Sequence, residues 1–141
     1  MMLRQVGLAT ITIFAAAVSA SAGGDAEAGK KVFNKCLACH NVGEGAVNKV
    51  GPALTTVVGR TAGTYPDFNY STTNKNAGAQ GLVWTEENII AYLPDPAAFM
   101  KKFLTGKGKP ELYIDPPKML FKLADETQRA DVAAYLKTFA K

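Results

Sequence analysis

Apolar and polar residues recur with helical spacing in four segments of this chain. The first segment follows Asp25, a residue type that favours the N-cap, with an acidic residue in the next turn. It predicts a helix that runs to about residue 34 or 35. One face of this helix would carry Gly29, Val32, Phe33 and Cys36.

Two further helices are predicted in the middle of the chain. Thr85 precedes two glutamates and an apolar run, and Pro94 ends that helix near Tyr92. Asp95 and Pro96 then have the residue types of an N-cap and a first helical position. This next helix is predicted to stop at Gly106, because glycine favours a helix C-terminus.

The last helix is predicted to begin at residues 125–128, Asp-Glu-Thr-Gln, which resemble a capping box. Its apolar positions are Val132, Tyr135, Leu136 and Phe139. Glycine recurs in residues 41–64, and three prolines interrupt residues 107–123, so long loops are predicted there. Strand patterns are weak, and the sequence therefore predicts an all-α fold with long loops.

The first residues are typical of an export signal. Arg4 precedes an apolar run over residues 6–18, and Ala20-Ser21-Ala22 supplies small residues for cleavage. The run is too short to span a bilayer comfortably. We predict a cleaved signal peptide at residues 1–22, one domain at residues 23–141, and a location in the periplasm. The net charge of +4, without an arginine-rich cluster, gives no reason to expect a nucleic-acid partner.

Residues 36–40, Cys-Leu-Ala-Cys-His, carry the strongest chemical signal. Two thiols at this spacing can each add to a vinyl group of one porphyrin, and the histidine that follows can bind its iron. The chain has two cysteines and one histidine, all within this pentapeptide. The motif predicts one covalently bound haem c, held through Cys36 and Cys39, with His40 as an iron ligand.

Two other interpretations of the motif are less consistent with the sequence. A thioredoxin-like redox pair would be surrounded by a βαβ pattern, which is absent. A zinc site would need further cysteines or histidines, and the chain has none.

The function depends on whether a second residue binds the iron opposite His40. With such a residue the protein would transfer electrons, and without it the iron could bind a gas or react with peroxide. Methionine is the natural candidate, because a thioether favours reduced iron. Met100 lies within an apolar helical pattern and is predicted to fill the core. Met119 follows two prolines that restrict its loop, so Met119 is the preferred ligand. A peroxidase or a gas-binding cytochrome would instead need an open iron, and a peroxidase also a distal acid–base group.

The sequence from residue 24 to the C-terminus resembles the class I cytochromes c, and most closely the bacterial cytochromes c2. The segments that carry the resemblance are residues 24–33, 51–54, 59–63 and 113–121, together with Tyr70, Asn74 and Trp84. It implies the small cytochrome c fold, in which helices and loops wrap around one haem. It also implies that the Pro52 carbonyl accepts the His40 N–H, and that Met119 is the second iron ligand.

The resemblance assigns further residues to the haem propionates. It implies that Arg60, Tyr70 and Trp84 hydrogen-bond or charge-pair with a propionate, and that Asn74 supports a buried water. A buried carboxylate is costly without such donors.

The function implied is that of a soluble periplasmic one-electron carrier, not an enzyme, and a monomer. Its expected partners are a cytochrome bc1-type complex and an oxidase or a photosynthetic reaction centre, met by transient docking at the membrane surface. Lysines outnumber acids near the Cys36 and Met119 segments and would steer that docking. A subunit dedicated to one dehydrogenase would use the same domain and remains an alternative.

Overall fold

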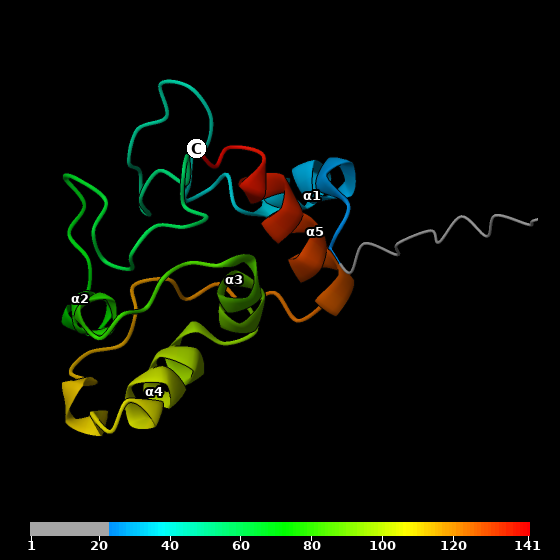
Figure 1. Cartoon of the computed structure of the whole chain (residues 1–141). Helices are drawn as coiled ribbons and strands as arrows, with labels where there is room; N and C mark the ends of the chain where they lie inside the picture. Colours follow the sequence, from blue (N-terminus) through cyan, green and yellow to red (C-terminus); the bar gives the residue numbers. More distant parts are fainter. Residues whose placement is uncertain (1–22) are drawn as a thin grey trace, which may run out of the picture.

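The computed structural model describes residues 23–141, and the predicted signal peptide lies outside them. This part of the chain forms five α-helices joined by long loops (Figure 1). The helices are α1 (Ala26–Val32), α2 (Thr72–Ala79), α3 (Glu86–Tyr92), α4 (Pro96–Gly106) and α5 (Glu126–Lys137). Two 3-10 turns, η1 (Phe33–Lys35) and η2 (Pro110–Leu112), follow α1 and α4.

Helices α1 and α5 cross at close range and bring the two ends of the domain together (Figure 1). The contact depends on Gly29, because a Cβ at this position would lie 1.9 Å from the carbonyl oxygen of Asp131. Beside it, the rings of Phe33 and Tyr135 lie 5.6 Å apart. The Asp131 side chain also accepts a hydrogen bond of 2.7 Å from the backbone N–H of Asp25. A close backbone approach at Gly29, an aromatic pair and a hydrogen bond therefore hold this crossing together.

All four predicted helices are present, and each begins at the predicted cap. The side chains of Asp25, Thr85, Asp95 and Asp125 all accept hydrogen bonds from the first backbone N–H groups of their helices. These bonds satisfy donors that a helix N-terminus otherwise leaves free. Residues 41–64 are loop, as predicted. Met100 is fully buried, which confirms its prediction as a core residue.

Helix α2 is absent from the sequence prediction. Ser71 caps it by accepting a hydrogen bond of 3.1 Å from the N–H of Asn74. Its residues include Thr, Asn and Gly, which are weak helix formers, and they show no clear apolar stripe. Tertiary contacts must therefore stabilise this helix.

Strand structure within residues 23–141 is limited to one isolated antiparallel bridge between Thr61 and Val83. The same part of the chain has no helix long and apolar enough to cross a membrane. Turn η1, helices α2, α3 and α5 and the loop before Leu123 line one interior space. This space is the site described next.

Candidate cofactor site

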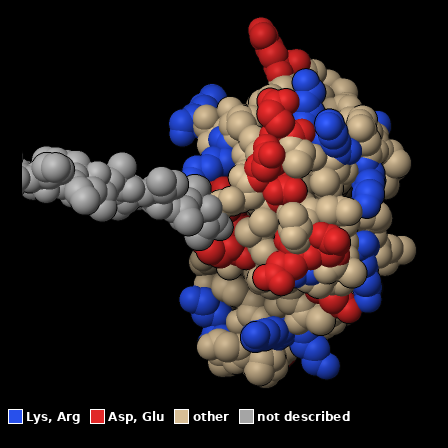
Figure 2. Space-filling view, turned by 90° about the vertical axis from the view of Figure 1, so that its right-hand side faces the viewer, with Lys and Arg blue, Asp and Glu red and all other residues tan. Residues whose placement is uncertain are grey.

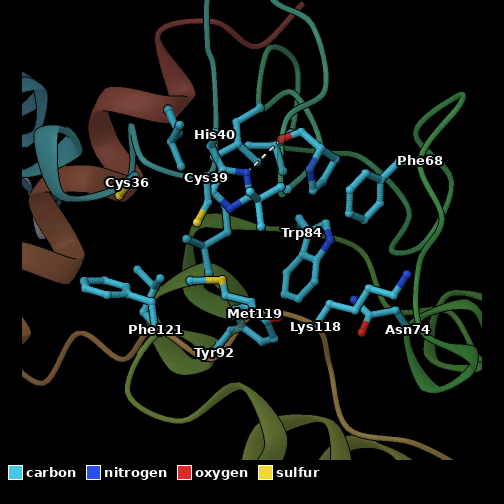
Figure 3. A pocket seen from close by; sticks show the side chains of 18 of the residues that line it. Cys36, Cys39, His40, Phe68, Asn74, Trp84, Tyr92, Lys118, Met119 and Phe121 are labelled. Carbon is cyan, nitrogen blue, oxygen red and sulfur yellow. Dashed lines mark hydrogen bonds between the residues drawn. The ribbon is translucent and has the colours of Figure 1, made fainter.

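A cavity of about 420 Å³ lies between the loops and the helices, and its walls are mostly apolar. Cys36, Cys39 and His40 reach it from one side, and Met119 reaches it from the loop after η2 (Figure 3). No aspartate or glutamate of residues 23–141 contributes to its lining. Its volume and apolar walls suit a large planar hydrophobic group with few polar contacts.

The local backbone brings the motif residues to one side. The N–H groups of Cys39 and His40 both bond the carbonyl oxygen of Cys36, at 3.0 and 2.9 Å. This turn continues directly from η1 and places residues at helical spacings i, i+3 and i+4 on one face. The two thiols and the imidazole therefore point into the same cavity (Figure 3).

The His40 ring is held in a fixed orientation. Its Nδ1 lies 2.8 Å from the carbonyl oxygen of Pro52, so Nδ1 donates its proton there and Nε2 is left as the acceptor. A Cβ on Gly51 would lie 2.3 Å from Cε1 of the ring, so residue 51 needs to be glycine. Burial lowers the pKa of His40, and the bond to Pro52 opposes this only in part. The imidazole is thus kept neutral, the form that binds metals.

The Cys36 thiol has the opposite character to a redox-active cysteine. Burial, aided by the neighbouring Cys39, raises the pKa of the Cys36 thiol to about 11, against the weaker effect of Lys35. Redox-active cysteines in C-x-x-C motifs have a lowered pKa instead. Residues 23–141 also contain no cluster of three or more His, Cys, Asp or Glu side chains that could hold a metal ion. Neither a thioredoxin-like centre nor a zinc site fits this geometry.

Met119 lies in the cavity, whereas Met100 is buried in the core on α4. Figure 3 shows Met119 and His40 pointing into the same space from opposite sides. The loop residues near Met119 differ in how far solvent reaches them. The Leu120 side chain is 82% exposed, whereas Pro117 is buried. The Met119 sulfur therefore points into the cavity, while Lys118 and Leu120 on either side of it are exposed to solvent.

The three residues assigned to the propionates by resemblance, Arg60, Tyr70 and Trp84, all line the cavity, and so does Asn74, which the resemblance assigned to a buried water. Arg60 donates hydrogen bonds to the carbonyl oxygens of Ala53, at 3.1 Å, and Thr55, at 2.5 Å. Burial raises the pKa of Tyr70 and lowers the pKa of Arg60. The electrostatic interaction and hydrogen bond between these two side chains oppose both shifts in part. These residues give the cavity several hydrogen-bond donors and its one arginine.

Two polar residues of the cavity were missed by the sequence analysis. Tyr92 projects from the end of α3, and burial raises its pKa while a hydrogen bond with the Asn74 side chain opposes the shift. Ser71 donates to the Asn74 side-chain oxygen at 2.8 Å. The sequence analysis named Tyr92 only as the end of a predicted helix. No sequence pattern around Tyr92 indicates that its side chain faces a cavity. These three side chains link α2 and α3 at the cavity wall.

The donor set fits a covalently attached haem: two thiols, one oriented neutral imidazole, one thioether and an apolar space between them. The sequence model of the cytochrome c family matches residues 26–140. This chain belongs to the cytochrome c family.

Within the family, the chain is most like the cytochromes c2. It is 57% identical to cytochrome c2 iso-1 of Rhodospirillum centenum over 117 residues, which cover 83% of this chain and 98% of that protein. It is also 57% identical to a cytochrome c2 of Rhodopseudomonas palustris, over 81% of this chain and 97% of that protein. The solved cytochrome c2 structure from Rhodospirillum centenum superimposes with a TM-score of 0.82 at 58% identity, covering 84% of this chain and all of that one.

These similarities confirm the predicted family, the all-α cytochrome c fold and one covalently bound haem c. The cytochromes c2 carry electrons to and from redox partners. The roles of individual site residues, the location of the protein and the identity of its partners are taken up below.

Proposed function

We propose that this cytochrome is a soluble periplasmic one-electron carrier whose haem iron is held by His40 and Met119. The observation that supports this most directly is the placement of these two side chains in one cavity, from opposite sides (Figure 3). When bound, haem supplies an iron that changes between the ferrous and ferric states. With residues 1–22 as a cleaved signal peptide, residues 23–141 would form the exported monomer.

The protein's own residues would keep the iron environment constant during this change. Pro52 and Gly51 hold the His40 ring in one orientation. The largely apolar cavity walls exclude water, and Arg60, Tyr70 and Trp84 would hold the propionates. Cys36 and Cys39 would tether the porphyrin so that neither His40 nor Met119 has to keep it in place. With His40 bound to iron, no second histidine is left to act as the distal acid–base group of a peroxidase.

The Met119→Ala substitution tests the proposed ligation. We expect loss of the near-infrared sulfur-to-iron charge-transfer band of the ferric protein and new binding of carbon monoxide to the ferrous protein, because one axial position would open. Met100→Leu is the matched control, since it removes the other thioether from the mature chain at a fully buried position. A Met119→Ala protein that keeps the band would refute the proposal.

The rim of the cavity has the properties of a transient docking surface. Its exposed apolar residues are Val50, Leu120 and Phe121. Lys35 and Lys118 are the charged side chains there, apart from Arg60. Acidic side chains instead gather in a band on the face presented by α1 and α5 (Figure 2). An apolar centre with lysines beside it suits an acidic partner such as a bc1-type complex, an oxidase or a reaction centre.

Electron transfer with such a partner is expected to slow as salt rises. Between about 20 mM and about 200 mM salt, we expect the second-order rate constant with an isolated bc1-type complex to fall by about tenfold, because screening removes the steering. Lys35→Gln should weaken this dependence, whereas Lys102→Gln, on α4, should not. A rate that is indifferent to salt would contradict electrostatic docking.

A further inference from the structure

The Met119 loop is tied to the start of α2 by a pair of residues that lie far apart in the sequence. Asp115 accepts hydrogen bonds from the backbone N–H groups of Thr72, at 3.0 Å, and Thr73, at 2.8 Å. Both bonds lower the pKa of the Asp115 carboxyl, and the bond from the Thr73 N–H has the larger effect. Asp115 thus accepts from two donors at the N-terminus of α2, in addition to the cap that Ser71 provides.

The Thr73 side chain in turn binds the backbone of the Met119 loop. Its hydroxyl oxygen, which is fully buried, accepts from the N–H groups of Ile114, at 3.0 Å, and Asp115, at 3.1 Å. Each residue therefore fixes the backbone of the other, and we call this reciprocal pair the 73–115 clamp. Asn76 adds a bond of 2.8 Å to the carbonyl oxygen of Leu112. The loop cannot move away from α2 without leaving buried groups unpaired.

The clamp is well placed to fix the position of Met119. Only Pro116, Pro117 and Lys118 separate the clamp from Met119, and the prolines hold φ near one value. Pro117 is itself buried. At the other end of the loop, the N–H of Leu123 bonds the carbonyl oxygen of Leu93 at 2.8 Å. The sulfur therefore lies on a short segment with an anchor at each end.

We propose that Asp115 and Thr73 are positioning residues for the Met119 sulfur: the clamp holds the loop closed on the haem iron. This inference depends on the ligation by Met119 proposed above. A thioether binds iron weakly, so the closed loop has to supply the preorganisation that the bond lacks. Helix α2 has few strong helix-forming residues. In this proposal, its role is to hold the Met119 loop in place through the 73–115 clamp.

Imidazole titration of the ferric haem protein tests the clamp. Imidazole binds only where the sulfur has left, so its apparent affinity reports the fraction of molecules with an open loop. We expect Asp115→Ala and Thr73→Val each to raise that affinity by about fivefold, the change that corresponds to the typical cost of losing a helix-capping side chain. The double variant should add little to either single change, since both break one unit. Thr73→Ser, which keeps the hydroxyl, should behave like the wild type.

Asp25→Ala separates positioning from general stability. Asp25 also accepts from two N–H groups at a helix start, Glu27 at 2.9 Å and Ala28 at 3.3 Å, but on α1 and away from the loop. This variant should lower the melting temperature while the imidazole affinity stays unchanged. The inference is overturned if the clamp variants bind imidazole like the wild type, or if Asp25→Ala raises the affinity equally.

A failure of the ligation itself would look different. The wild-type ferric protein would then lack the sulfur-to-iron band and would bind imidazole as tightly as Met119→Ala. If Thr73→Val does not fold, Asp115→Ala decides the matter, because the Asp115 side chain is only partly buried.

Discussion

Without its haem, the chain is expected to lose its folded structure. The cavity in which we propose that the haem is held measures about 420 Å³. At ~24 cal/mol per Å³, an unfilled apolar cavity of this size costs about 10 kcal/mol. That cost is comparable to the entire stability of a typical domain, about 5–15 kcal/mol. Circular dichroism of the haem-free chain should show little helix and no cooperative melting, in contrast to the haem protein.

The arrangement of the core supports this expectation. Phe33, Leu93, Val132 and Leu136 line the cavity and also belong to the main hydrophobic cluster. Three of them come from η1 and α5, so the crossing of the terminal helices and the cavity share one set of side chains. A haem-free chain with native helix content and a sharp melting transition would show that the terminal helices fold without the haem.

The helices that the sequence predicted are those with local signals. A capping side chain followed by an apolar stripe marks each of α1, α3, α4 and α5, and both signals lie within a few residues. The cysteine and histidine motif is equally local. Five contiguous residues were enough to predict the haem, because their spacing on one turn is itself the geometry of the site.

What could not be predicted depends on distant partners. Helix α2 has weak helix formers, and it is stabilised by Asp115, more than 40 positions away from Thr72 and Thr73. Nothing near either position marks that pairing. The cavity-facing role of Tyr92 likewise depends on a distant partner, the Asn74 side chain on α2. The roles of Pro52 and Arg60 came only from resemblance to a family, since an isolated proline or arginine has no characteristic spacing.

Gly29 lies at the closest approach of α1 to α5, and no other residue type fits there. A Cβ at this position would lie 1.9 Å from the carbonyl oxygen of Asp131 and 2.9 Å from Cβ of Tyr135. The first of these atoms belongs to the backbone of a helix and cannot move aside as the end of a flexible side chain would. The two helices would have to separate, which would also disturb the Phe33–Tyr135 ring pair and the bond from Asp25 to Asp131.

Gly29→Ala is therefore expected to lower the free energy of unfolding of the haem protein by about 3 kcal/mol, at the upper end of the cost of overpacking. The melting temperature should fall by about 10 °C. Gly106→Ala is the matched control, because Gly106 also lies in a helix but has no atom within 4 Å of the added Cβ. That change should leave stability unchanged or raise it by up to about 1 kcal/mol. Equal effects of the two substitutions in denaturant titrations would show that the closeness of α1 to α5 does not require glycine at position 29.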